Sequence, residues 1–243
     1  MDQLRDYSDD RLVNGCVYCG GIGETKDHIP SRIFLDSPYP TNLPVVDACK
    51  ECNNSFSKDE EYTACLIEAA FHGTTNPEEM RRLKIGKTLS YQSLLRSQIE
   101  SCKEEINGEI SFTPDETRVK NVILKLAKGH IAYEFSSIRR DKPSYFSFWP
   151  IHSMSLEERE DYELPHFLEI YGEVGSRALQ RTMIIEMTQQ TSSGYNKTIP
   201  FLMNDWLEVQ NNRYRYLVYE SKNKVGVKIV IGEYLACNVM WLN

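Results

Sequence analysis

The chain lacks any long apolar run. No stretch approaches the roughly 18 uninterrupted apolar residues of a membrane helix, which excludes a helical membrane protein. An excess of positive charge is also missing, because 35 acidic residues outnumber 28 lysines and arginines and the formal net charge is −7. This balance argues against a protein that coats nucleic acid through bulk charge, but a local basic face could still bind it. The N-terminus is acidic and polar, without the apolar core of a signal peptide, so we expect a soluble cytoplasmic protein without membrane contact.

Internal repeats and low-complexity tracts are absent as well, so nothing indicates a repeat architecture. The seven cysteines form an odd count, and in a cytoplasmic chain metal binding is favoured over a disulfide framework. Three of them, Cys65, Cys102 and Cys237, stand alone and are expected to be buried or incidental thiols.

The other four cysteines form two CxxC pairs, Cys16 with Cys19 and Cys49 with Cys52. Two such knuckles can supply the four thiolates of a closed tetrahedral site, so the spacing predicts one structural zinc ion. A zinc knuckle that binds a partner and catalyses nothing would carry the same four residues. The material between and after the knuckles is therefore what bears on catalysis.

An Asp-His dipeptide lies between the knuckles, and an amide follows the last cysteine directly. Hydrolysis of a phosphodiester needs an activated water and neutralisation of the developing charge. The His28 imidazole is a suitable general base. The Asp27 carboxylate and the Asn53 amide are oxygen ligands suited to a hard cation such as Mg²⁺ or Mn²⁺. Adjacent residues of an extended strand point to opposite faces, so Asp27 and His28 would straddle a phosphate only if the strand is distorted.

These residues resemble the HNH endonucleases, also called ββα-metal or His-Me finger nucleases. The resemblance covers roughly residues 12–72, under a third of the chain. The matching residues are Cys16, Cys19, Asp27-His28-Ile29-Pro30-Ser31, Asn42-Leu43-Pro44, Cys49, Cys52-Asn53-Asn54, Ser57, Glu60 and Glu61. The combination is more specific than any one motif alone.

The resemblance implies a role for each matched polar residue. His28 would be the general base, Asp27 and Asn53 would bind the catalytic divalent ion, and Asn42 would orient the histidine. One departure is Phe56, at a position where many members of the family carry a lysine. That departure leaves Asn54 as an alternative ligand to Asn53.

Plainer roles are open for several of these side chains. Asn53 and Asn54 could cap a helix, and Asn42 could be a turn residue before Leu43-Pro44. Glu60 and Glu61 lie on the face of Asn53 if the helix is continuous, where either could touch a metal or an arginine. A solvated pair of carboxylates is the commoner outcome.

The rest of the chain predicts an α+β fold, with helices followed by a largely antiparallel sheet. We expect a lead-in over 1–14, a nuclease domain over 15–75 with a treble-clef-like ββα unit, and an α+β domain of unknown role over 76–243. Apolar spacing predicts helices over 77–107 and from Thr113 to about Phe135. Strands are predicted at 145–151, 166–172, 181–187, 213–220, 225–233 and 235–242.

A mostly basic stripe lies on the second predicted helix. Arg118, Asn121, Lys125 and Lys128 recur at spacings of three and four residues. Such a stripe could contact phosphates, but it is more often the solvated face of an amphipathic helix.

Together these features predict a metal-dependent endonuclease that hydrolyses phosphodiester bonds in nucleic acid, with DNA preferred. A zinc-stapled binding module with an inert site, or a nuclease subunit that needs a protein partner, is the alternative. The sequence leaves open whether the chain forms a homodimer.

Overall fold

The computed structural model describes residues 15–168, 176–190 and 196–243, and it confirms the α+β class. The predicted lead-in over 1–14 lies outside the described residues. At the N-terminal end, β1 (Thr25–His28) pairs antiparallel with β2 (Val45–Ala48), and α1 (Lys50–Ser55) follows directly. The loop between the two strands contains the short helix η2 (Arg32–Phe34). These elements form the ββα unit that the sequence predicts.

The helix after the second knuckle is interrupted. α1 ends at Ser55 and α2 (Ser57–His72) begins after Phe56, which the sequence left open. The Ser57 hydroxyl donates to the carbonyl of Asn54 at the junction of the two helices. Gly73 ends α2 in the left-handed conformation (φ 68°).

The helical segment predicted over 77–107 is confirmed as far as Glu100 and is wrong beyond it. The segment contains η3 (Pro77–Glu79), α3 (Leu83–Tyr91) and α4 (Ser93–Glu100), followed by a hairpin of β3 (Lys103–Ile106) and β4 (Glu109–Phe112). Asn107 and Gly108 make the turn with φ values of 56° and 83°. Asn-Gly is the pair that a two-residue hairpin turn with two positive φ angles prefers, so the local signal for a hairpin was present.

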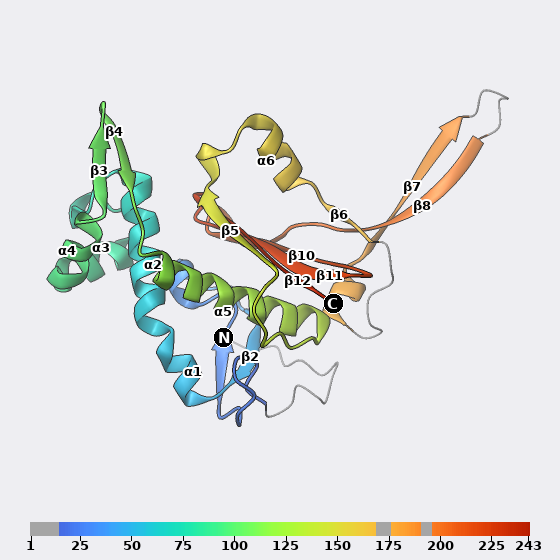
Figure 1. The fold of residues 1–243 in the computed structure, drawn as a ribbon, viewed down its shortest axis with the longest axis horizontal. Helices are drawn as coiled ribbons and strands as arrows, with labels where there is room; N and C mark the ends of the chain where they lie inside the picture. The colour runs from blue at the N-terminus through green and yellow to red at the C-terminus, as the bar shows by residue number, and fades with distance from the viewer. Residues whose placement is uncertain (1–14, 169–175, 191–195) are drawn as a thin grey trace.

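Helix α5 (Glu116–Phe135) lies at the centre of the molecule, between the ββα unit and the large sheet (Figure 1). The Asp115 carboxylate caps its first turn by accepting from the N–H groups of Thr117 and Arg118. Its buried residues cover most of its circumference, because it packs against α2 and β2 as well as against the sheet.

The large sheet has five strands in the order β5-β12-β11-β10-β9, all antiparallel. Their bounds are β5 (Tyr145–Pro150), β9 (Leu207–Gln210), β10 (Tyr214–Ser221), β11 (Lys224–Ile231) and β12 (Leu235–Leu242). Alternate residues such as Val227, Ile229 and Val239 belong to the core shared with α5. The residues between them, including Lys228 and Asn238, therefore face the other side of the sheet.

Helix α6 (Leu156–Glu163) lies over that other side, after the short η4 (Ile151–Ser153) (Figure 1). A second sheet has the order β6-β8-β7, and its β7–β8 hairpin projects from the body. The bounds are β6 (His166–Phe167), α7 (Arg177–Gln180), β7 (Met183–Gln190) and β8 (Asn196–Asn204). The strand predicted over 166–172 begins as expected, and its part beyond 168 lies outside the described residues.

One hydrophobic core extends across the predicted boundary at residue 75. It joins Phe34 and Leu43 of the β1–β2 loop with Leu126 of α5 and Trp241 of β12. Within the described residues, no helix combines the length and apolar character needed to cross a membrane.

Candidate metal centre and Asp-His strand

The four predicted zinc ligands converge. The sulfur atoms of Cys16, Cys19, Cys49 and Cys52 all lie within 4.8 Å of one another. The Cys19 and Cys49 sulfurs are 3.7 Å apart. Zn–S bonds of about 2.3 Å in a tetrahedron place the sulfurs about 3.8 Å apart. The donor set and its dimensions therefore fit a structural zinc ion.

Backbone hydrogen bonds shape both knuckles. Gly20, with φ 84°, donates to the Cys16 carbonyl, and the Cys52 N–H donates to the Cys49 sulfur at 3.3 Å. The Val17 N–H donates to the Asp47 carbonyl, so the first knuckle is attached to β2. Burial alone would raise the pKa of Cys16, but hydrogen bonds from the backbone of Cys49, Cys19 and Tyr18 outweigh it and lower the pKa to about 7. The thiolate that zinc needs is therefore favoured.

His28 is the last residue of β1 and lies opposite Val45 of β2. Its ring is half-buried, and its Nε2 is 3.2 Å from the Arg32 guanidinium. Burial, together with the positive charges of Arg32 and Lys125, lowers the pKa of His28 to about 4. The imidazole is therefore neutral near pH 7 and can accept a proton through Nε2. Arg32, at the start of η2, was not singled out from the sequence.

Asp27 points to the other side of β1 and is buried, with 6% of its surface exposed. The Tyr18 hydroxyl donates to its Oδ2 at 2.7 Å. Burial, and next the negative charge of Asp27, raise the pKa of Tyr18 well above its ordinary value, so the phenol keeps the proton that it donates. The Lys125 ammonium lies 2.9–3.0 Å from the two carboxylate oxygens of Asp27.

The same ammonium binds two further oxygen atoms. Its nitrogen is 2.6 Å from Ser31 Oγ and 2.6 Å from Glu60 Oε1, and Ser31 in turn donates to Glu60 at 2.5 Å. We call Asp27, Ser31, Glu60 and Lys125 the Lys125 cage. Lys125 is 2% exposed, so the cage is closed to solvent from the lysine side.

Helix α5 approaches the Asp-His strand closely one turn beyond Lys125. A Cβ atom at Gly129 would lie 2.5 Å from the Cδ1 atom of Ile29, the residue that follows His28. Only glycine permits this separation without a shift of the buried Ile29 side chain. Lys125 and Gly129 together fix α5 against the end of β1.

The residues expected to bind a catalytic divalent ion do not fit one in this arrangement. Both oxygens of Asp27 are already bonded to Tyr18 and Lys125. The Asn53 amide nitrogen donates to Thr25 Oγ1 at 3.1 Å, and not to Asp27. A cation does lie against Asp27, but it is the ammonium of Lys125.

The other predicted site residues lie around this centre without joining it. Asn54 is exposed, with its carbonyl accepting from Ser57, and Asn42 is exposed at the turn before β2. Glu61 accepts from Gln92, on the side of α3 and α4, whereas Glu60 belongs to the Lys125 cage. Of the two carboxylates, the structure thus brings only Glu60 to the Asp-His strand.

The basic stripe of α5 faces the ββα unit and α2, where the sequence suggested an open surface. Arg118 forms an ion pair with Asp59 at 2.8 Å, and Asn121 donates to the same carboxylate. Lys125 is buried and unable to reach a phosphate. Lys128 is half-buried near the Arg140 carbonyl, and burial lowers its pKa. Nucleic-acid binding by Arg118 and Lys128 stays a prediction.

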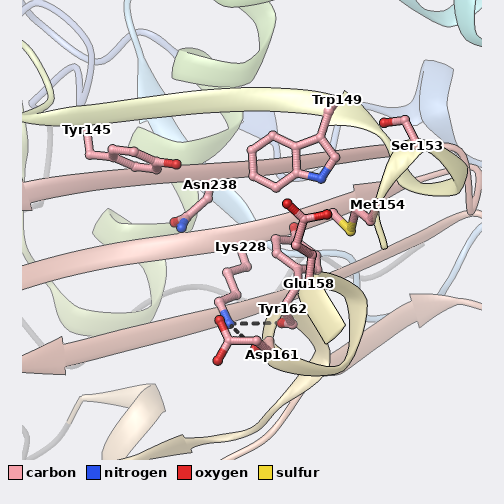
Figure 2. Close-up of a pocket in the computed structure, with 9 residues that line it drawn as sticks. All are labelled: Tyr145, Trp149, Ser153, Met154, Glu158, Asp161, Tyr162, Lys228 and Asn238. Atoms are coloured by element: carbon pink, nitrogen blue, oxygen red, sulfur yellow. Dashed lines mark hydrogen bonds between the residues drawn. The ribbon is translucent and has the colours of Figure 1, made fainter. Parts of the chain in front are cut away.

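A separate pocket of about 430 Å³ lies on the face of the large sheet that α6 covers (Figure 2). Figure 2 shows Trp149, Tyr145 and Asn238 side by side on the sheet, with Lys228 pointing toward the end of α6. The Lys228 ammonium donates to the Tyr162 carbonyl at 2.8 Å. The lining combines aromatic rings with two carboxylates and an ammonium, and it favours no single class of ligand.

Comparison of the chain with protein-family models, with curated proteins and with solved structures gives no significant match.

Proposed function

We propose that the chain is an endonuclease of the HNH type that hydrolyses phosphodiester bonds in nucleic acid, with DNA as the preferred substrate. The observation that carries the proposal is the position of His28. It is a neutral imidazole at the end of β1, in a ββα unit whose four cysteines are arranged for zinc. A zinc knuckle that only holds a fold together has no need of such a base.

In the proposed reaction, a water molecule attacks the phosphorus and loses its proton to Nε2 of His28, while the bond from phosphorus to the leaving sugar oxygen breaks and that oxygen takes a proton from solvent. The Arg32 guanidinium, which donates toward Nε2 in the free protein, is exposed and can turn to a phosphate oxygen. Its departure frees the lone pair of Nε2 for the proton. The zinc ion holds the knuckles and takes no part in these steps.

The resemblance also implies catalytic Mg²⁺ or Mn²⁺. Such an ion would lack the ligand that the resemblance names, because both carboxylate oxygens of Asp27 are bonded to Tyr18 and Lys125.

The test is cleavage of supercoiled plasmid by the zinc-loaded full chain, with and without added Mg²⁺ or Mn²⁺. We expect His28→Ala to reduce the rate by about 10²–10⁴, with zinc content and unfolding midpoint unchanged. Lys26→Ala, two residues earlier on the same strand, is the matched control and should retain most activity. Wild-type rates in His28→Ala would remove the proposed mechanism.

A second candidate is a zinc-stapled binding module with an inert site. The Lys125 cage favours it, because both carboxylate oxygens of Asp27 are bonded within the protein, to Tyr18 and Lys125, and are not free for a catalytic cation. Absence of cleavage together with DNA binding that survives His28→Ala would support this candidate over the nuclease.

A further inference from the structure

We propose that Lys125 is a built-in cation. Its ammonium fills the cation position beside the Asp-His strand, so the folded chain binds no divalent ion at Asp27. Asp27 is then a positioning residue: its bond to Lys125 of α5 fixes the end of β1 and with it His28. Any divalent ion used in cleavage binds elsewhere. The claim about ion occupancy is independent of nuclease activity, and only the positioning of His28 rests on the proposed function.

The hydrogen-bond donors of Lys125 match the acceptors around it. A lysine ammonium has three N–H donors and no acceptor. The three side chains around it, Asp27, Ser31 and Glu60, all offer oxygen atoms at 2.6–3.0 Å. Every donor has a partner, and the oxygens that a hard cation would bind are the ones already bound.

The distances around Lys125 suit an ammonium and not a divalent metal ion. Mg²⁺ binds oxygen at about 2.0–2.1 Å in near-octahedral geometry and retains several waters. The present nitrogen–oxygen separations suit an ammonium hydrogen bond and leave no room for a hydrated ion while Lys125 stays in place. A divalent ion next to this ammonium would also meet a like charge within a buried site.

Lys125 cannot easily withdraw. Its neighbours on α5, Leu126 and Ala127, are fully buried in the core, and Gly129 contacts Ile29. The helix is therefore held at both the sheet and the strand end. Because the Lys125 ammonium is part of the same chain, its effective concentration at Asp27 is high, and a free metal ion must compete with it.

The test is Mn²⁺ binding to the zinc-loaded full chain. Binding is measured as a decrease in the electron paramagnetic resonance signal of free Mn²⁺. We expect wild type and Asp27→Asn to bind Mn²⁺ equally weakly, with less than a twofold difference. Asp27→Asn keeps an oxygen toward Lys125, so it is the variant that should fold. A wild-type Mn²⁺ site that Asp27→Asn abolishes would overturn the proposal.

The second arm removes the ammonium. We expect Lys125→Met to gain a Mn²⁺ site at least about tenfold tighter than any in wild type, and Asp27→Asn/Lys125→Met to lose it again. Lys128→Met, three residues further on the same helix, should behave as wild type. A folded Lys125→Met that gains no site would show that the ammonium does not exclude the ion, and would also overturn the proposal. Both Mn²⁺-binding experiments can be read even if the chain does not cleave plasmid, so failure of this proposal is distinguishable from failure of the proposed function.

Discussion

The zinc knuckles and the Lys125 cage lie in one ββα unit, and both surround the position of a cation, but they are assembled differently. The knuckles draw all four ligands from 37 consecutive residues, Cys16 to Cys52. The cage brings Lys125 to carboxylates that precede it by 98 and 65 residues. A short motif can specify its own metal ligands. What its carboxylate binds is decided by a helix that the motif does not contain.

The largest effect should come from the knuckles. Cys49→Ser removes one thiolate, and because zinc binding and folding are coupled in such units, a contribution of about 10–16 kcal/mol from the ion is put at risk. We expect loss of zinc and of amide protection over 15–56, measured by elemental analysis and hydrogen exchange. Cys102→Ser, a half-buried thiol outside the cluster, should keep its zinc. If Cys49→Ser lost its zinc but stayed folded, the expected coupling of zinc binding to folding would be wrong.

The next effect should come from the cage. Lys125→Met leaves the buried Asp27 carboxylate without its cation, which should cost about 3–5 kcal/mol of unfolding free energy. Asp27→Asn/Lys125→Met removes both charges of the Asp27–Lys125 pair, leaves Glu60 as the only charge of the cage, and should recover much of that loss. Urea unfolding measures all three proteins, with Lys128→Met as the control near wild type. Equal stability of the single and double variants would indicate that the ion pair contributes nothing beyond packing.

A smaller, pH-dependent effect should come from His130, five residues after Lys125 on α5. Burial, and then the positive charges of Arg181 and Lys125, lower the pKa of His130 well below its ordinary value. Its Nε2 is 2.8 Å from the Tyr214 hydroxyl, and its ring stacks on Tyr216 at 3.7 Å. In the unfolded chain His130 takes up a proton near pH 6.5, whereas in the folded chain it stays neutral. The free energy of unfolding should therefore fall as pH decreases below that value.

The expected slope from this group is at most about 1.4 kcal/mol per pH unit. Urea unfolding of wild type and His130→Gln at pH 7 and pH 5.5 isolates it, because the zinc contribution is common to both proteins. The difference between the two proteins should narrow at the lower pH. A difference that is independent of pH would exclude a buried neutral imidazole as its source.

The smallest effect concerns the one lysine of the stripe that is not buried. Lys128→Gln should leave the unfolding free energy within about 0.5 kcal/mol of wild type. If it contacts a phosphate, it should weaken DNA binding about equally for all sequences and lower the salt slope by about one. Titration at two salt concentrations decides this, with Lys120→Gln, exposed on the same helix, as the control. An unchanged slope identifies a merely solvated residue.

The sequence predicts the knuckles correctly because CxxC spacing fixes the sulfur positions within a few residues. It also predicts α5 and the C-terminal strands from their apolar periods. Lys125 was expected on a solvated helix face. A period of 3.6 residues separates the apolar face of a helix from the polar one, but it does not say which part of the protein covers the polar face. Here the ββα unit covers it, through bonds to Asp27 and Glu60.

The β3–β4 hairpin was missed for a different reason. Leu95, Ile99, Cys102 and Ile106 continue a helical spacing into residues that form a strand, and that spacing was given more weight than the Asn107-Gly108 turn. Arg32 was not singled out, and Ser31 was matched but given no role, because they lie at the start of a short helix in a proline-rich loop, where no periodicity draws attention to single side chains.

The contact between Gly129 and Ile29 limits how this unit can be transplanted. A fragment ending near residue 75 would carry the cysteines, the Asp-His strand and Glu60, but neither the ammonium between the carboxylates nor the helix surface that covers Ile29. Two neighbouring negative charges and an apolar strand end would then meet water together. The nuclease-like motif is thus not a portable module, and its grafting onto another scaffold would require a substitute for α5 as well.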